Sequence, residues 1–402
     1  MTAPHRGRPP WAAWLLPLAG LLLLGAAIRA LRLPAALRTD VPPPDVISIE
    51  RITVSPQGLQ ARVVNAGPRP VTIAQVTVDD AFWSFHLDPS PTLPRLGRAT
   101  LTIPYPWVQG EPHHIRLLTS TGLVFDRELE AAVETPAPGM AQILAYAFIG
   151  GFVGLVPVAL GLSFYPAMRR MGRRRLNAIL ALTVGMLVFL LIDTGQEALE
   201  VTAQLPGVFQ GLAVVLLSAL LTWLAIVAIG GLRRSQAQRL PKGVYVAWLL
   251  AASIGLHNLG EGMAIGAAFA LGEAALGSFL ILGFTLHNIT EGVGIAAPLT
   301  PGRHDLPLGY RPRLATFAGL TIVAGGPAII GAWIGGFAYS PLAAAAALGV
   351  GLGAIWQVIL EVGRLLRDDA VRHEEPLVTG TNLLGFGVGA GVMYLTALLV
   401  TI

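Results

Sequence analysis

The sequence predicts an all-α polytopic membrane domain, preceded by an N-terminal transmembrane or signal helix and a small extracytoplasmic β-sandwich. Hydrophobic residues make up 54% of the 402 positions and charged residues only 12%, well below the quarter or so that is usual in a soluble domain. The net charge of +4 comes from arginines in short loops beside apolar runs, so it indicates membrane topology and no nucleic-acid partner. The chain has no cysteine, which excludes disulfides and thiolate metal ligands.

Apolar runs that could each cross the ~30 Å hydrocarbon core with about 20 residues recur along the chain. They are Trp11–Ile28, Ile143–Pro166, Ala178–Glu197, Gln210–Leu232, Val244–Leu271, Ala275–Ala297, Ala315–Phe337, Leu342–Gly363 and Asn382–Ile402. The first run follows a basic start, His5, Arg6 and Arg8, as a signal sequence or a retained anchor does. Either form would export the segment that comes next.

Between the first two runs the pattern changes to short stretches of alternating apolar and polar residues, which are typical of half-buried strands. The predicted strands are Ile47–Val54, Leu59–Val64, Val71–Val78, Thr100–Ile103 and His114–Leu118. They predict a β-sandwich of roughly 90 residues, followed by a Pro-rich linker. We therefore expect three parts: a signal-anchor helix (1–40), a β-sandwich (41–135) and an eight-helix membrane domain (140–402).

Lysines and arginines fall in every odd-numbered loop of the membrane domain and in none of the even-numbered ones. They are Arg169, Arg170, Arg173, Arg174 and Arg175; Arg233, Arg234, Arg239 and Lys242; Arg303, Arg311 and Arg313; and Arg364, Arg367 and Arg372. Because cytoplasmic loops carry the excess of basic residues, the odd loops are predicted to be cytoplasmic. The β-domain and the C-terminus would then lie outside the cytoplasmic (inner) membrane.

One pattern, H-N-x-x-E-G, occurs in two successive membrane helices. Its polar members are His257, Asn258 and Glu261 in the fourth helix of the domain and His287, Asn288 and Glu291 in the fifth. Residues four apart share a helix face, so each helix offers an imidazole and a carboxylate to the same side. The short link Gly272–Ala274 predicts antiparallel neighbours. Nitrogen and oxygen ligands of this kind suit Zn²⁺, Fe²⁺ or Mn²⁺.

A single intramembrane His or Glu is often no more than a partner in an interhelical hydrogen bond. Two carboxylates near the membrane centre are harder to explain in that way, because each costs at least ~2.5 kcal/mol on insertion scales. A shared cation would compensate them both. Gly260, Gly262 and Gly292 next to the motif either loosen the helices or allow close helix packing, and packing is the favoured interpretation.

Further acidic and amide side chains extend this line toward both membrane surfaces. Asp193 and Glu197, with Glu200, end the second helix, while Gln357 and Glu361 lie toward the other end of the seventh. Such residues can simply flank helix ends in water. Together they predict a pathway with an acidic entrance, a midplane site and an acidic exit.

On these residues, positions from about 140 to 402 resemble the ZIP family of divalent-metal transporters, in particular its GufA-like bacterial members. The two H-N-x-x-E-G helices carry the resemblance, and Leu190–Ala198 and Gly353–Glu361 support it. The resemblance implies an eight-helix fold with inverted repeats, both ends outside, and movement of metal toward the cytoplasm.

This chain departs from the family pattern at several positions. Gly260 and Thr290 stand where proline is frequent, and Gly325-Gly326-Pro327 lacks the glutamate that accompanies a two-metal site. We therefore expect one tightly held ion, and we expect Gly326→Glu to create a second site. The exported β-domain is not part of the family pattern.

The leading functional hypothesis is transport of Zn²⁺, with Fe²⁺ and Mn²⁺ as alternatives, by a protein that is not an enzyme and has no resident cofactor. The sequence shows no P-loop. A membrane-embedded metalloenzyme and a metal-sensing receptor remain as alternatives, although H-E-x-x-H is absent. The expected partners are the metal ion and the bilayer; a homodimer and a partner for the β-domain are left open.

Overall fold

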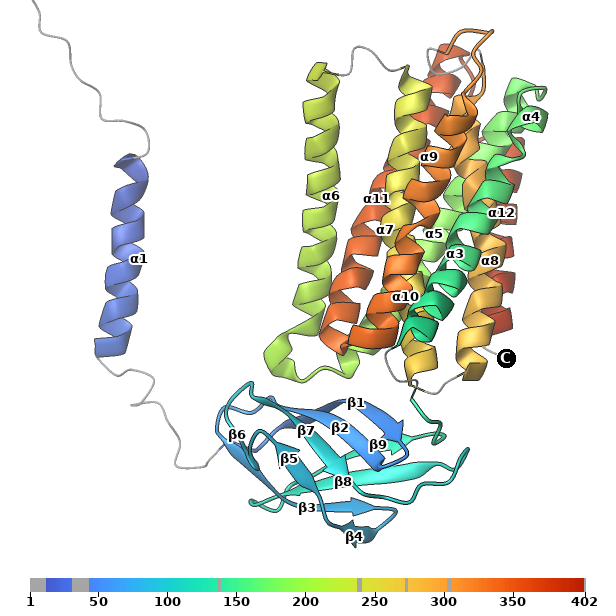
Figure 1. The fold of residues 1–402 in the computed structure, drawn as a ribbon. Coiled ribbons are helices and arrows are strands. Elements are labelled where there is room, and N and C mark those ends of the chain that lie inside the picture. Colours follow the sequence, from blue (N-terminus) through green and yellow to red (C-terminus); the bar gives the residue numbers. More distant parts are fainter. Residues whose placement is uncertain are drawn as a thin grey trace, which may run out of the picture. The chain divides into compact units, whose positions relative to one another are not determined.

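The computed structural model describes residues 12–30, 43–135, 139–236, 241–271, 274–301 and 306–400. Contacts divide the chain into two units, Met1–Pro44 and Asp45–Ile402. The first unit contains helix α1 (Ala12–Ala30), which corresponds to the first predicted apolar run, although Trp11 lies outside the described residues. The second unit contains a β-sandwich and a bundle of long helices (Figure 1).

The sandwich consists of two antiparallel sheets, with strand orders β1-β2-β7-β5 and β4-β3-β8-β9, and with β6 paired to β3. The strands are β1 (Ile47–Ser55), β2 (Gly58–Asn65), β3 (Val71–Val78), β4 (Ala81–Trp83), β5 (His86–Asp88), β6 (Thr92–Leu93), β7 (Arg98–Ile103), β8 (His113–Thr119) and β9 (Val124–Leu129). All five predicted strands are confirmed. The prediction missed β4, β5 and β6, which are too short to show alternation, and the charged edge strand β9.

The bundle begins after the sandwich and contains eight helical segments that are long and apolar enough to cross a membrane. Its helices are α3 (Met140–Leu162), α4 (Tyr165–Met168), α5 (Arg173–Ala203), α6 (Gly211–Gln236), α7 (Lys242–Ala270), α8 (Ala274–Ala296), α9 (Leu314–Gly325), α10 (Pro327–Ala338), α11 (Pro341–Arg372) and α12 (Gly380–Val400), with short 3₁₀ turns at Gly207–Phe209 and Ala297–Leu299. The protein is therefore a multi-pass membrane protein, as predicted. The predicted link Gly272–Ala274 lies largely outside the described residues.

The helices pack as two groups. The first, called the α7 group, contains α3, α7, α8, α9 and α10; the second, called the α5 group, contains α5, α6, α11 and α12. The groups meet mainly where α11 packs on α7 and α12 packs on α8. Small residues allow the closest approach inside the α7 group: a Cβ added at Gly262 would lie 2.1 Å from the Ala328 oxygen, and one added at Gly331 would lie 2.0 Å from the Leu259 oxygen. Close backbone contact of this kind replaces hydrophobic burial as the packing force between membrane helices.

The seventh predicted run, Ala315–Phe337, is broken into two helices at Gly326. Pro327 has no N–H to donate to the carbonyl four residues earlier, so α9 ends at Gly325 and α10 begins at Pro327. Another helix-interior proline, Pro157, lies inside α3, which continues to Leu162. Membrane helices tolerate such residues when neighbouring helices satisfy the freed backbone groups.

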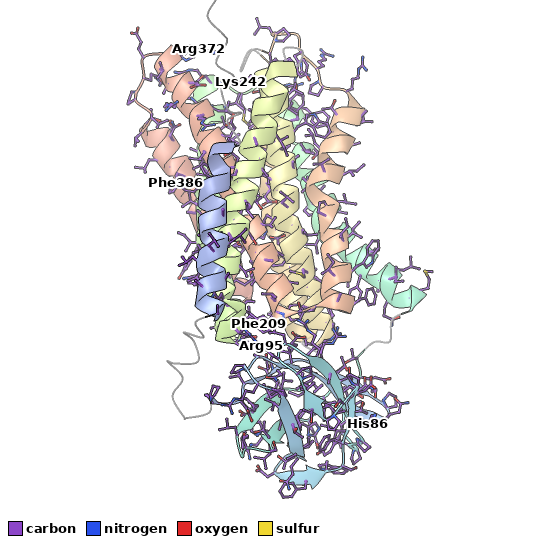
Figure 2. All side chains as sticks on the ribbon, turned by 90° about the vertical axis from the view of Figure 1, so that its left-hand side faces the viewer. His86, Arg95, Phe209, Lys242, Arg372 and Phe386 are labelled. Carbon is purple, nitrogen blue, oxygen red and sulfur yellow. The ribbon has the colours of Figure 1, made fainter. Side chains whose placement is uncertain are left out.

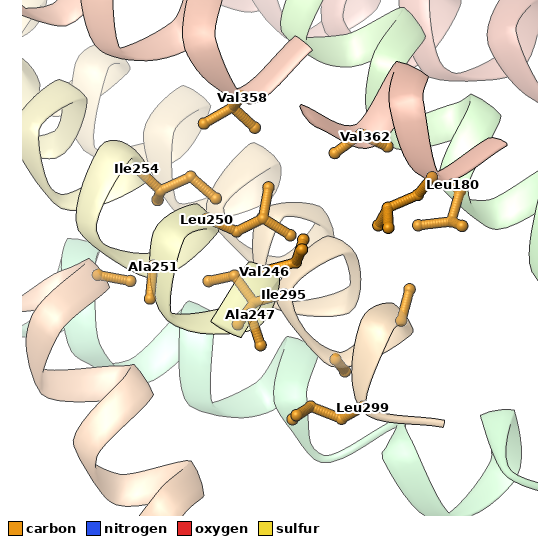
Figure 3. Close-up of a cluster of buried hydrophobic side chains, with 14 of the residues drawn as sticks. Leu180, Val246, Ala247, Leu250, Ala251, Ile254, Ile295, Leu299, Val358 and Val362 are labelled. Carbon is orange, nitrogen blue, oxygen red and sulfur yellow. The ribbon is translucent and has the colours of Figure 1, made fainter. Parts of the chain in front are cut away.

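One end of the bundle is basic and is separated from the bundle middle by an apolar layer. Figure 2 shows Lys242 and Arg372 at this end and Phe209 at the opposite end. Along α7, Val246, Leu250 and Ile254 follow Lys242, and they pack with residues of α5, α8, α11 and the 3₁₀ turn Ala297–Leu299 (Figure 3). The packed residues are Leu180, Ile295, Leu299, Val358 and Val362, all buried. This apolar layer closes the basic end.

Candidate metal centre

The two motif helices bring four ionisable side chains together about halfway along the bundle. Both imidazoles meet one carboxylate: His257 Nε2 lies 3.0 Å and His287 Nε2 lies 2.5 Å from Glu261 Oε1. His257 is one helical turn before Glu261 on α7, so the i, i+4 spacing aligns them. His287 comes from α8, which packs directly on α7. None of the three residues is more than 6% exposed.

Glu291, one turn after His287 on α8, completes the cluster. Within the described part of the chain, donor atoms of His257, His287 and Glu291 form a group whose members all lie within 4.8 Å of one another. Glu291 is 2% exposed, and neither of its carboxylate oxygens has a hydrogen-bond partner among the described residues. Burying a carboxylate without donors is costly. A divalent cation between these groups would remove that cost.

The two motif asparagines are fully buried, and each amide nitrogen is tied to a neighbouring helix. Asn258 Nδ2 donates to the Ala324 carbonyl of α9 at 3.1 Å, and Asn288 Nδ2 donates to the Val153 carbonyl of α3 at 3.1 Å. A carbonyl only accepts, so these bonds fix which amide atom is nitrogen. Neither Oδ1 finds a donor among the described residues. Asn288 Nδ2 also donates to Glu261 Oε2 at 3.3 Å, so the amide nitrogen of Asn288 faces a carboxylate of the centre.

These donors make a nitrogen and oxygen site with two carboxylates. One divalent ion facing Glu261 and Glu291 is charge-neutralised, and the two imidazoles complete a set of four donors. Such a mixed set suits Zn²⁺, Fe²⁺ and Mn²⁺, whereas Mg²⁺ and Ca²⁺ prefer oxygen alone. Binding would replace the hydrogen bonds that the imidazoles now make to Glu261.

A cavity of about 420 Å³ leads from this cluster toward the end of the bundle opposite Lys242. It is lined by His257, Glu261 and His287 at one end and by residues such as Asp193, Glu197, Glu200, Phe284, Leu271 and Tyr339 beyond them. Asp193 and Glu197 expose their side chains to it. The structure thus places these two predicted pathway residues on the cavity wall. Their carboxylates would attract cations to the centre.

The structure places the other two predicted pathway residues away from this cavity, on the part of α11 beyond it. Gln357 is buried, and its Oε1 accepts a hydrogen bond from Trp223 Nε1 of α6 at 3.0 Å. Glu361 Oε2 pairs with Arg364 Nη1 of the same helix at 2.9 Å. Both side chains therefore have partners that are not metal donors.

The motif glycines differ in their surroundings. Packing accounts for Gly262 and for Gly292, where an added Cβ would lie 2.4 Å from the Val158 oxygen. At Gly260 an added Cβ meets nothing within 4 Å, because this residue lines the cavity. Packing is therefore the wrong explanation for Gly260. At Gly326 an added Cβ would lie 2.5 Å from the Ile322 oxygen, so Gly326→Glu would strain the helix break before it could supply a ligand.

Sequence reasoning missed residues that border the centre without belonging to the motif. The Phe284 ring packs edge-on against His287 with centroids 5.5 Å apart, and a Cβ at Gly351 of α11 would lie 3.6 Å from His257 Nδ1. Phe284 lies three residues before His287, so helical spacing could have found it. Gly351 comes from the other helix group, and nothing local in the sequence connects it to the centre.

Two β-domain histidines, His113 and His114, make hydrogen bonds, and no β-domain histidine is part of the metal-donor group found among the described residues. His113 Nδ1 lies 2.8 Å from Asp79 Oδ2, which also accepts from Tyr105 at 2.9 Å, and the His114 N–H donates to Asp79 Oδ1 at 2.8 Å. Burial alone would raise the pKa of Asp79, but these hydrogen bonds outweigh it, and the pKa is lowered.

No protein-family model matches this chain, and no curated protein matches its sequence. Inferences about its role therefore rest on its own residues and their arrangement.

Proposed function

We propose that this chain is a ZIP-like transporter that moves divalent transition-metal ions, Zn²⁺ first among them, across the membrane through the His, Asn and Glu centre. The observation that carries the proposal is Glu291, a buried carboxylate with no hydrogen-bond partner among the described residues, beside two imidazoles at the inner end of a cavity. Nitrogen and oxygen donors of this kind fit the ion.

The layout of the bundle supports a pathway better than a closed structural site. The cavity reaches the centre from one end, and the apolar layer separates the centre from the basic end. A substrate site near the membrane middle, open to one side at a time, is the usual arrangement in transporters. A metalloenzyme with the same donors would not need a gated pathway to the second side of the membrane.

The direction of transport is proposed from charge. Basic residues gather at the closed end of the bundle, among them Arg169, Arg173, Lys242 and Arg372, which by the positive-inside rule is the cytoplasmic end. In this proposal metal enters from outside an inner membrane and leaves toward the cytoplasm, and the β-domain lies outside. Single cysteines in this cysteine-free chain test the orientation: Ser90→Cys should react with an impermeant thiol reagent on intact cells, and Leu308→Cys should not.

Uptake by proteoliposomes decides between the function classes. Vesicles that contain the purified protein and a trapped fluorescent zinc indicator should accumulate Zn²⁺ with saturation. Glu261→Ala or Glu291→Ala should abolish this uptake. Both variants should still insert into the membrane, since removing a buried acid lowers the insertion cost. Binding of Zn²⁺ without accumulation would instead favour the receptor. Normal uptake by both variants would refute the site.

A further inference from the structure

Two prolines lie close to the backbone carbonyls that hold the site asparagines. Pro157 is inside α3, four residues after Val153. In an α-helix the N–H of each residue donates to the carbonyl four residues earlier, so a proline at this position removes the donor for the Val153 carbonyl. That carbonyl accepts instead from Asn288 Nδ2 at 3.1 Å. The asparagine takes up the hydrogen bond that the proline leaves open.

On the other side of the centre the second asparagine is held by a carbonyl at a helix end. α9 ends at Gly325 because Pro327 begins a new helix, and the last carbonyls of a helix lack partners within it. Ala324 lies in this last turn, and its carbonyl accepts from Asn258 Nδ2 at 3.1 Å. Each of the two motif helices thus has its asparagine anchored at a carbonyl of a neighbouring helix, and the Val153 carbonyl is the one that a proline four residues later leaves without a donor.

The anchoring decides where each amide oxygen points. With the nitrogen held by a carbonyl, Oδ1 is directed away from that helix, and for both residues Oδ1 is without a donor among the described residues although the residue is 0% exposed. A free asparagine could rotate its amide and satisfy the oxygen elsewhere. The opened carbonyl therefore fixes the orientation of the amide. Asn288 Nδ2 also donates to Glu261 Oε2 at 3.3 Å, so the anchored amide holds a carboxylate of the centre in place.

We infer that Pro157 is a positioning residue of the metal centre, which acts through the Val153 carbonyl on Asn288 and thereby on Glu261. The inference rests on the proposed function only in taking a divalent metal as the ligand. The coupling between Pro157 and Asn288 holds whether or not the protein transports.

Pro157→Ala gives the sharper test, because alanine returns an N–H that competes for the Val153 carbonyl. In purified protein in detergent we expect Zn²⁺ to bind about tenfold more weakly, the value of roughly one hydrogen bond. The metal-free protein should at the same time melt at a higher temperature, because α3 regains its hydrogen bond. Opposite changes in affinity and stability are not expected of a proline that serves packing alone. Pro341→Ala is the control, since a proline at the start of α11 leaves open no helical hydrogen bond.

A double-mutant cycle isolates the coupling. In an Asn288→Ala background, Pro157→Ala should not weaken zinc binding further, and its effect on the metal-free melting temperature should differ from its effect in the wild type. In an Asn258→Ala background, the effects of Pro157→Ala on affinity and melting temperature should simply add. An unchanged affinity in Pro157→Ala, or additive effects with Asn288→Ala, would overturn the inference. A protein that shows the coupling but accumulates no zinc in vesicles would refute transport and leave the positioning role intact.

Discussion

Replacing Glu291 by glutamine tests whether this carboxylate neutralises a bound ion. The substitution keeps the side-chain volume and removes the charge of a residue that is only 2% exposed. In the wild-type centre two carboxylates face the two charges of the ion; in the variant one positive charge stays buried without a partner. Removing one partner of a buried ion pair costs about 3–5 kcal/mol. This corresponds to an affinity loss of about two to nearly four orders of magnitude.

Thermal unfolding of the purified protein with and without Zn²⁺ measures this loss. At a free metal concentration about 100 times the wild-type Kd, binding stabilises the folded state by about 2.7 kcal/mol. The variant's Kd would then equal or exceed that concentration, so the same metal should stabilise it by about 0.4 kcal/mol or less. Glu361→Gln is the matched control, because Glu361 is also buried in a membrane helix but pairs with Arg364. If Glu291→Gln kept the full metal-induced stabilisation, the assignment of Glu291 would be wrong.

Four further substitutions test the packing of the glycines, the role of Gln357 and the acid dependence of the β-domain. Gly262→Ala should lower the melting temperature through the clash of its Cβ, whereas Gly260→Ala should be neutral or stabilising by up to about 1 kcal/mol; thermal unfolding of the pair in detergent checks this. Trp223→Phe should cost about 1 kcal/mol of stability by freeing Gln357 and leave the zinc Kd unchanged. The folded-state pKa of Asp79 is lowered, so its carboxylate stabilises the β-domain at pH values above the unfolded-state pKa, and this stabilisation is lost as the pH falls through the folded-state pKa. Asp79→Asn should remove this stabilisation at neutral pH. Protease resistance of the variant should therefore depend less on acid pH than that of the wild type.

Much of the local structure could be predicted from the sequence. The eight membrane-capable segments follow from apolar length, because any 20-residue apolar run must form a helix in lipid. Strands such as Val71–Val78 follow from alternation, because one face of each strand is buried and the other is not. The spacing of His257 and Glu261 was sufficient to place both on one helix face.

Helix pairing was not predictable in the same way. Lipid is as apolar as the protein interior, so the membrane helices are hydrophobic all round, and no apolar stripe marks the face that packs. The sequence therefore could not show that Gln357 accepts a hydrogen bond from Trp223 or that Glu361 pairs with Arg364, and their role in a pathway stays a prediction. Gly260 and Gly262 are equally uninformative in sequence, yet one lines the cavity and the other lies against a neighbouring backbone.

The sequence by itself determined the chemistry of the centre: which donors exist, that none is a thiolate, and that each motif helix carries imidazole, amide and carboxylate at helical spacing. Only the tertiary structure decided how these donors meet. The approach of His287 to Glu261 and the unpartnered oxygens of Glu291 depend on contacts between residues far apart in the chain. So does the anchoring of Asn288 by a carbonyl that Pro157 leaves open. Helical periodicity acts over four residues and is written in the local sequence, whereas helix–helix contacts depend on surface shape and backbone geometry, which composition does not encode.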